Sequence, residues 1–593
     1  MVSILKITSL KKVAPIGLVV VIILLALLFN PLIERWNDDP KVYLFFFASF
    51  ATVFFFLFYY ILTYQFILNR IDWLIVIAAL LLIITQLLDH RVFPFYLSDG
   101  FISLTAVLCM YVPLKHISKK STGVLLYVFF LLMLIELSIG LFQLTIRLLY
   151  DTYQSGCLTG SFKNSGIYSI FLCCCWPSFL FVNKKIINNF LRKCIYFILF
   201  FIVVIILLID NSRTGFILMM IACFFYHRNW LCKIYTRFIS KNNFYKILLL
   251  LLSFLIVVAS VYLKYNSSIG RLLILKISAK MFSEKPLLGW GEAGFDKYYL
   301  FQQADYFKRN LSGDIAYRFV ASDTVNSFNE YMMILVCFGS IGLIIFSFFI
   351  KKTYNFYNVY KPAGEYYNGL TLLLILISAF FYYSFHITLL AIIALGIVSD
   401  ISANIPGTQL KYPIVKKITG GIIMLIFGLL FTYVFSQYKA TLKWQEVIIN
   451  NKQNKLYSSD LLKEVYPDLK HRSNFLYSYG TIMYQQRKYT NCISVLEECQ
   501  LIQPSADLLL YLGKAYQHQN NYDKAEYCFT EASYISPVRF TPLYFLVELY
   551  LIENSKPKAL ILARQIMVKT VKVPSLEVER IKNKMVILLE NSQ

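Results

Sequence analysis

Residues 268–295 read S-I-G-R-L-L-I-L-K-I-S-A-K-M-F-S-E-K-P-L-L-G-W-G-E-A-G-F, and they belong to a polar stretch between apolar runs of membrane length. This polar and aromatic stretch runs from Lys264 to Tyr331 and closes on V-N-S-F-N-E-Y. Long loops with a pattern of their own are usually functional or disordered, and this one is too aromatic for disorder. We therefore expect it to contribute to an active site.

The chain as a whole has the composition of a membrane protein. Of its 593 residues, 58% are hydrophobic and only 15% are charged, whereas soluble proteins carry about a quarter charged residues. Many apolar runs approach or reach the roughly 20 residues that a helix needs to cross a bilayer. We predict an all-α, polytopic protein with about 12 or 13 transmembrane helices, the least certain being the two around Arg213. The expected spans are 14–34, 42–62, 72–88, 100–114, 123–147, 166–183, 195–210, 213–227, 246–263, 329–350, 368–384, 386–402 and 417–437.

The net charge of +24 is explained by membrane topology and does not indicate a nucleic-acid partner. Lys and Arg gather in alternate short loops, which is the pattern of cytoplasmic loops in membrane proteins. This places the N-terminus in the cytoplasm, and the 264–328 loop and everything after residue 437 outside it. The first run lacks a small-residue cleavage site, so we expect a retained helix rather than a signal peptide.

The 12 cysteines show neither metal-ligand spacing nor a disulfide framework. Cys173, Cys174 and Cys175 lie inside an apolar run, and Cys492 and Cys499 have helical spacing. We expect buried core residues here and no metal site.

The chain after residue 437 is polar, helical and repetitive. S-Y-G-T-I-M-Y (478–484), Y-L-G-K-A-Y-Q (511–517) and L-V-E-L-Y-L (546–551) recur at 33 to 34 residues, the period of tetratricopeptide repeats. We predict a membrane domain at 1–437, with a large periplasmic loop at 264–328, and a periplasmic helical domain at 438–593 with repeats at about 470–575. The repeats serve either as a protein-binding surface or as a packing platform over the membrane domain.

Two candidate sites lie beside predicted spans. G-S-F-K-N-S-G (160–166) contains Asn164 and suits a tight turn at a helix start. D-N-S-R-T-G (210–215) places Arg213 between two apolar runs, where an ionisable side chain is paired or faces a polar cavity. The alternatives are a plain helix cap for Asn164 and a side chain extended to the membrane surface for Arg213.

Two further candidates lie in the 264–331 stretch. Arg271 and Lys276 belong to a predicted amphipathic helix on the membrane surface, which is an anchor or part of a site. Gly289, Trp290 and Gly291 form a glycine-rich turn, and Asn329, Glu330 and Tyr331 begin the tenth span, where capping alone is the alternative. The expected apolar face of the surface helix consists of Leu272, Leu275, Ile277 and Met281.

Arg213 and Arg271 are predicted to face the same compartment. Guanidinium groups bind phosphate oxygens in a bidentate manner. The two arginines therefore suit a substrate with a lipid tail in the outer leaflet and a diphosphate at the interface.

Five segments, in this order, resemble the O-antigen ligase/polymerase superfamily over roughly residues 100–400. They are G-S-F-x-N-S-G, S-R-T-G, G-R-L-L-I-x-K, K-P-L-L-G-W-G-E-A-G-F and F-N-E-Y-M-M-I-L-V-C-F-G-S-I-G-L. The resemblance implies a GT-C-like glycosyltransferase that needs no metal or other cofactor. It would move a glycan from an undecaprenyl-diphosphate carrier to an acceptor hydroxyl at the periplasmic face of the bacterial inner membrane. Arg213 and Arg271 would then hold the diphosphate.

The chain departs from the family pattern at Phe328, where many ligases carry a histidine. Glu330, Asp323 and His386 are the candidates to replace it, and we favour Glu330. A diphosphate is a good leaving group, so the absence of a strong base is the alternative.

Three acceptors remain open within the superfamily: lipid A–core in lipopolysaccharide assembly, a growing polysaccharide, or a protein. Two other classes are a lipid-linked glycan transporter and a non-enzymatic assembly scaffold that recruits partners through its repeats. A transporter would carry charged residues at mid-span, whereas these spans keep most of theirs at the ends.

Overall fold

The computed structural model is almost entirely helical. A short antiparallel ladder of β1 (Ile67–Leu68) and β2 (Thr408–Gln409) is the only sheet in the part of the chain that it describes. The predicted spans 14–34, apart from Ile23, and 246–263 lie outside the described residues. The structure describes residues 23, 40, 42–63, 67–89, 97, 99–120, 123–150, 158–162, 164–229, 264–310, 315–324, 326–360, 364–409, 413–452 and 459–591.

The chain divides into two compact units. The first takes the described residues up to 229 and those from 344 to 438, and the second takes 264–343 and the residues from 439 on. The boundary falls within α15 (Glu330–Tyr360) and α18 (Pro413–Lys452). The other helices of the first unit are α2 (Val42–Thr63), α3 (Arg70–Asp89), α4 (Asp99–Cys109), α5 (Tyr111–Lys120), α6 (Val124–Tyr150), α7 (Ser165–Lys184), α8 (Asn189–Ile209), α9 (Arg213–Tyr226), α16 (Glu365–Ser378), η2 (Ser384–His386) and α17 (Thr388–Ala403).

The structure confirms a multi-pass membrane protein. Among the described residues, six helical segments are long and apolar enough to cross a bilayer: Gly100–Lys119, Val124–Leu149, Ser165–Lys184, Asn189–Ile209, Glu330–Tyr360 and Gly420–Asn450. Shorter apolar helices account for other predicted spans, among them α9 and α17. The total of 12 or 13 spans and the orientation of the termini stay predictions.

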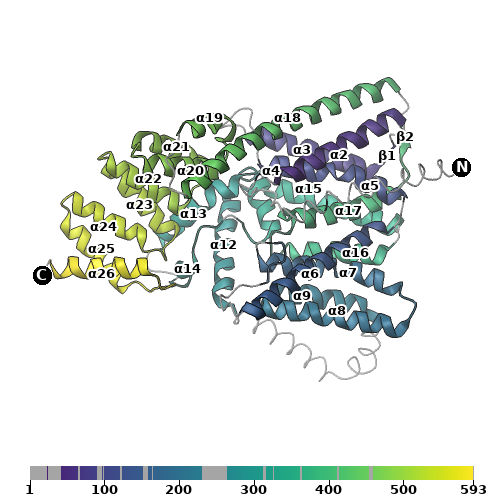
Figure 1. The fold of residues 1–593 in the computed structure, drawn as a ribbon, viewed down its shortest axis with the longest axis horizontal. Coiled ribbons are helices and arrows are strands. Elements are labelled where there is room, and N and C mark those ends of the chain that lie inside the picture. Colours follow the sequence, from purple (N-terminus) through teal and green to yellow (C-terminus); the bar gives the residue numbers. More distant parts are fainter. Residues whose placement is uncertain are drawn as a thin grey trace. The chain divides into compact units, whose positions relative to one another are not determined.

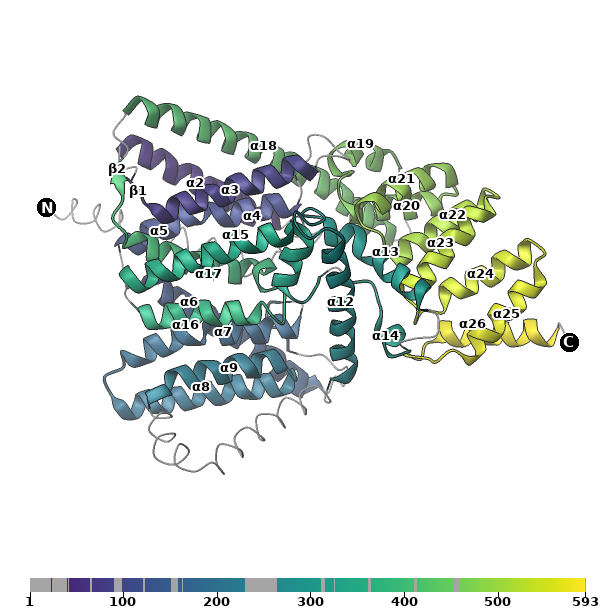
Figure 2. The same ribbon diagram turned by 180° about the vertical axis from the view of Figure 1, so that it is seen from behind.

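Helix α7 is the centre of the first unit, where it packs against α6, α8, α9 and α16 (Figures 1 and 2 show these helices alongside one another). Cys173, Cys174 and Cys175 are fully buried on it, as expected for small core residues. Helix α8 instead exposes apolar side chains such as Phe197 and Phe201. An apolar outer face is stable only where lipid replaces water, so α8 has the surface of a lipid-facing helix.

The second unit joins the 264–343 stretch to the C-terminal helices. Its helices, besides the parts of α15 and α18, are α12 (Tyr265–Glu284), α13 (Gly294–Arg309), α14 (Ile315–Val320), α19 (Ser459–Leu469), α20 (Ser473–Gln485), α21 (Tyr489–Ile502), α22 (Ala506–His518), α23 (Tyr522–Ile535), α24 (Thr541–Ile552), α25 (Lys556–Val568) and α26 (Leu576–Glu590). We call α19–α26 the C-terminal helices. The predicted membrane domain at 1–437 and periplasmic domain at 438–593 stay a prediction. By packing, residues 264–343 group with the residues from 439 on.

The C-terminal helices form repeated hairpins with the predicted spacing. Gly480 in α20 lies against Leu496 in α21, and 33 residues later Gly513 in α22 lies against Phe529 in α23. A Cβ at either glycine would overlap the facing side chain, so small residues permit the close helix pairing. Each hairpin turn also contains a residue with positive φ, namely Arg487, Asn520 and Asn554. Their assignment as tetratricopeptide repeats stays a prediction.

Candidate functional site

Two side chains of α6 hold the glycine-containing turn before α7. Glu136 is fully buried and accepts hydrogen bonds from the Ser161 N–H at 3.0 Å and the Ser161 hydroxyl at 2.5 Å. Gln143 accepts from the N–H groups of Thr159 and Gly160, both at 3.0 Å. Gly160 has a φ of 59°, and a Cβ there would overlap the Glu136 carboxylate. The turn is therefore held by polar groups that come from within the unit.

Asn164 caps α7. Its side-chain oxygen accepts a hydrogen bond from the Gly166 N–H at 2.8 Å, so the capping interpretation is confirmed. A Cβ at Gly166 would lie 3.2 Å from the Tyr382 hydroxyl. The connection that contains His386 therefore starts at the same end of α7. A contact between substrate and Asn164 or His386 stays a prediction.

Asp210 joins the α8–α9 turn to this end of α7. Its carboxylate is 2% exposed and accepts hydrogen bonds from the Leu158 N–H at 2.9 Å and the Ser169 hydroxyl at 3.1 Å. A buried carboxylate is stable only with such donors. Asp210 thus ties together three segments, namely the 158–162 turn, α7 and the α8–α9 turn.

Arg213 begins α9 directly after this turn. Asn211 has a φ of 50°, and the Ser212 hydroxyl caps α9 by accepting a hydrogen bond from the Gly215 N–H at 3.3 Å. Arg213 is half-buried. The structure therefore brings together the predicted segments of Asn164, Arg213 and His386 at one end of the first unit.

Arg271 lies on α12 in the second unit, where its guanidinium group covers the ring of Phe328 at 5.3 Å from the centroid. This contact joins the start of the 264–331 stretch to its end. Lys276 donates a hydrogen bond to the Tyr306 hydroxyl at 2.9 Å, and Lys280 pairs with Asp305 at 2.8 Å. Both contacts fasten α12 to α13.

The predicted amphipathic helix exists as α12, and its position on the membrane surface stays a prediction. Of its four expected apolar residues, Ile277 and Met281 are buried within the protein. Leu272 and Leu275 are 51% and 38% exposed, and Leu273 and Ile274 are buried instead. Helices α13 and α14 pack against α12.

The turn at 286–291 interlocks with a break in α15. Gly339 has φ 64° and ψ −165°, so the helical hydrogen-bond pattern stops there. The freed carbonyls of Val336 and Cys337 accept from the N–H groups of Trp290 and Gly291 at 2.8 and 2.9 Å. The freed N–H groups of Ser340 and Ile341 donate to the carbonyls of Pro286 and Leu287 at 2.8 and 3.3 Å. The turn thus supplies every hydrogen bond that these four backbone groups lost to the break.

Both glycines of this contact are required by its closeness. A Cβ at Gly289 would overlap the backbone of Cys337, and one at Gly339 would overlap the carbonyl of Leu287. Trp290 is fixed by a hydrogen bond from its indole N–H to the Met281 carbonyl at 2.8 Å. The N–H groups of Trp290 and Gly291 are used within the protein, so this turn is not a phosphate-cradling loop. Substrate contact through other atoms of Gly289, Trp290 and Gly291 stays a prediction.

The N-E-Y segment begins α15, and Asn329 is its cap. The Asn329 side chain accepts from the Met332 N–H at 3.0 Å. Glu330 is the first helical residue and is 3% exposed, so capping by Glu330 is not needed. Phe328 precedes them with a φ of 52°, which is unusual for a bulky residue and is held here by packing.

Comparison with protein families matches residues 197–347 to the model described as O-Antigen ligase. Over this segment the chain is similar to the O-antigen ligase family. The match takes in both arginines, the interlocked turn and Glu330, whereas Asn164 and His386 lie outside it. No curated protein and no solved structure matches the chain.

The ligase segment spans both units. Arg213 belongs to the first unit and Arg271 to the second, and each unit has its own geometry. A single diphosphate site built from both arginines therefore stays a prediction, as do the roles of Lys276, Glu330 and Tyr331.

Asp323 was one candidate to replace the ligase histidine, and the structure ties it to the C-terminal helices. Its carboxylate accepts a hydrogen bond from the Ala506 N–H at 3.2 Å, at the start of α22. Burial raises the pKa of the Asp323 carboxyl, although the hydrogen bond from Ala506 and the charge of Arg539 oppose this. Asp323 thus has a structural partner that the sequence did not indicate.

Sequence reasoning missed Glu136 and Gly339. An acidic residue inside the apolar run 124–150 was a usable signal for Glu136, because such a group needs buried partners. Gly339 stands in C-F-G-S-I-G inside a predicted span, where a glycine weakens a helix. The glycine-rich turn about fifty residues earlier was predicted, but no local pattern indicated that it bonds to the break at Gly339.

Proposed function

We propose that this protein is a cell-envelope glycosyltransferase that moves a glycan from an undecaprenyl-diphosphate carrier to an acceptor hydroxyl. The reaction takes place at the periplasmic face of the inner membrane. The observation that carries the proposal is the O-antigen ligase match at 197–347, which encloses both Arg213 and Arg271. Both arginines occupy defined positions, one at the start of α9 and one stacked on Phe328.

In this reaction the bond between the sugar C1 and the diphosphate oxygen breaks, and its electron pair stays on the diphosphate. A new bond forms between C1 and the acceptor oxygen. Arg213 and Arg271 would bind the diphosphate oxygens in a bidentate manner and offset the charge that develops there. No metal ion is assigned to this step.

Glu330 would accept the proton that the acceptor hydroxyl loses. Its carboxylate is buried at the first turn of α15, two residues after the Phe328 ring that supports Arg271. Phe328 has no proton acceptor, so it cannot replace a histidine base. Its ring instead holds a cation at the place where the leaving group would be bound.

The membrane arrangement belongs to the same proposal. We infer a GT-C-like domain of 12 or 13 spans with a cytoplasmic N-terminus, and with the 264–328 loop and the C-terminal helices in the periplasm. A lipid-linked donor would reach the arginines from the outer leaflet. The acceptor is lipid A–core, a growing glycan or a protein, and the C-terminal helices would meet it or a protein partner.

The test is reconstitution of the purified full-length protein with an undecaprenyl-diphosphate-linked glycan and each acceptor class in turn. The Arg213→Ala and Arg271→Ala variants should each lose about 100- to 1000-fold in turnover, as expected when a group that stabilises the developing charge is removed. Arg309→Ala is the matched control, because Arg309 is 71% exposed in its pair with Asp305. Transfer by both arginine variants at the wild-type rate would overturn the site, and no transfer by the wild type to any acceptor would overturn the function.

A further inference from the structure

We infer that the C-terminal helices position the loop that carries Arg271, with Gln303, Lys308 and Asp323 as the positioning residues. This inference rests on the proposed function for its meaning in catalysis. The contacts themselves lie within the second unit.

The first contact joins α13 to the end of α23. Gln303 is 1% exposed, and its side-chain N–H donates to the Ile535 carbonyl at 2.6 Å and to the Ser322 carbonyl at 3.3 Å. The Tyr299 hydroxyl donates to the Gln303 side-chain oxygen at 3.1 Å. Ile535 is the last residue of α23, and a helix leaves its final carbonyls without internal partners. Gln303 therefore completes the end of a helix that lies 232 residues further along the chain.

The second contact is an ion pair between Lys308 of α13 and Glu531 of α23. Glu531 is 4% exposed, so its carboxylate depends on a cation from outside its own helix. Removing one partner of a buried pair leaves an uncompensated charge. Lys308 also lies over the ring of Tyr534, at 5.9 Å from the centroid.

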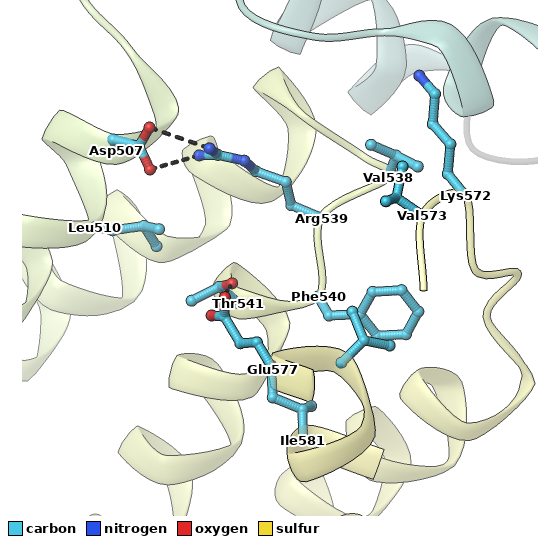
Figure 3. Close-up of a pocket in the computed structure, with 11 residues that line it drawn as sticks. Asp507, Leu510, Val538, Arg539, Phe540, Thr541, Lys572, Val573, Glu577 and Ile581 are labelled. Carbon is cyan, nitrogen blue, oxygen red and sulfur yellow. Dashed lines mark hydrogen bonds and ion pairs between the residues drawn. The ribbon is translucent and has the colours of Figure 1, made fainter. Parts of the chain in front are cut away.

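The third contact is that of Asp323 with the Ala506 N–H at the start of α22. The positive end of a helix dipole favours a carboxylate at this position. The hydrogen bond to Asp507 raises the pKa of Arg539, and the charges of Asp507 and Asp323 add to this. Arg539 donates hydrogen bonds to both carboxylate oxygens of Asp507, at 2.6 and 3.1 Å (Figure 3). Both residues line a cavity of about 320 Å³.

The three contacts constrain the position of Arg271 in two ways. Helix α13 is held by the C-terminal helices and is tied to α12 through Lys276 and Lys280. Asp323 stands five residues before Phe328, whose ring carries the Arg271 guanidinium. One constraint fixes the helix that bears the arginine, and the other fixes the ring beneath it. A repeat domain that served only to bind partners would need neither.

The experiment uses the full-length protein with three variants: Lys308→Ala, Glu531→Gln, and the charge swap of Lys308→Glu with Glu531→Lys. We expect each single variant to lose roughly 10- to 100-fold in turnover, because small misplacements of a binding group have effects of this size. The swap should recover to within about threefold of the wild type, because it restores the attraction with the signs reversed. Glu464→Gln is the control, since Glu464 forms an exposed pair with Lys443 in the same unit.

Hydrogen exchange at residues 268–284 supplies a readout that does not depend on activity. Exchange should rise in both single variants, return to wild-type levels in the swap and stay unchanged in Glu464→Gln. Unchanged exchange in the single variants, or single variants that retain full turnover, would overturn the inference. A wild-type protein that transfers no glycan would overturn the proposed function instead, and the exchange result would still decide the positioning.

Discussion

Arg213 follows a turn whose hydrogen bonds reach 41 and 52 residues along the chain, through Ser169 and Leu158. The loop that carries Arg271 is bonded to residues 223 and 232 positions away, through Glu531 and Ile535. The first turn is held from within the apolar unit, by the buried carboxylate of Asp210. The second is held in part by helices that follow the last predicted span. The segment of Arg213 is thus held by helices of its own unit close to it along the chain. The segment of Arg271 is also held by the C-terminal helices, which follow it at long range.

The largest expected effect is that of deleting residues 459–593. The deletion removes the partners of Gln303, Lys308 and Asp323, so we expect turnover to fall by at least about 100-fold. Membrane insertion should persist, because all six candidate spans lie before residue 459. Glycan transfer by the purified protein, together with membrane fractionation, checks this. If the truncated protein transferred at more than a third of the wild-type rate, the segment of Arg271 would not depend on the C-terminal helices, and the contrast with Arg213 would be wrong.

Gly339→Ala should come next in size. Its φ of 64° strains any residue with a side chain, and the added Cβ would overlap the Leu287 carbonyl. We expect a loss of more than about 3 kcal/mol, since the backbone strain alone accounts for about 1–3 kcal/mol. Thermal unfolding of the purified protein measures it.

Gly421→Ala is the matched control for that substitution. Gly421 lies in α18 with open space around it, so alanine should stabilise its helix by roughly 1 kcal/mol or less. Equal effects at the two positions would show that the interlocked turn does not constrain α15.

Asp210→Asn should have the smallest of the three effects. The Leu158 N–H and the Ser169 hydroxyl bond to different oxygens of the carboxylate. An amide has only one oxygen, so one of these donors loses its partner, at a cost of about 1–3 kcal/mol. Thermal unfolding and the KM for the lipid-linked donor are the measurements. Asp210→Asn should shift both measurements by the same amount in the protein that lacks residues 459–593, because these contacts stay within the first unit. Strong coupling between the two changes would mean that the Arg213 turn also depends on the C-terminal helices.

Much of the fold was predictable because its causes are local. Apolar runs of membrane length predicted helices such as α2 and α7 close to their observed bounds. The 33- to 34-residue period predicted the hairpins after residue 470, and in two of them a glycine packs against the next helix. The buried cysteines of α7 followed from the apolar run around them.

The candidate site was less predictable. G-W-G indicated a glycine-rich turn, but its backbone donors bond to α15, and the reason lies in the break at Gly339. Asn329 was expected at a helix start and proved to be the cap. Asp323 was considered a candidate base, and its partner proved to be Ala506. In each case the residue type was informative, but its partner was distant in sequence.

The sequence by itself determined that the chain is helical, that it crosses a membrane several times and that it resembles O-antigen ligases. These properties depend on hydrophobicity, on period and on short motifs, which a linear pattern records. Only the tertiary structure decided that residues 264–343 pack with the C-terminal helices. That choice rests on single side chains, such as Gln303, meeting backbone groups more than two hundred residues away. A hydrogen bond of this range needs only one amide and one free carbonyl, and neither leaves a local pattern.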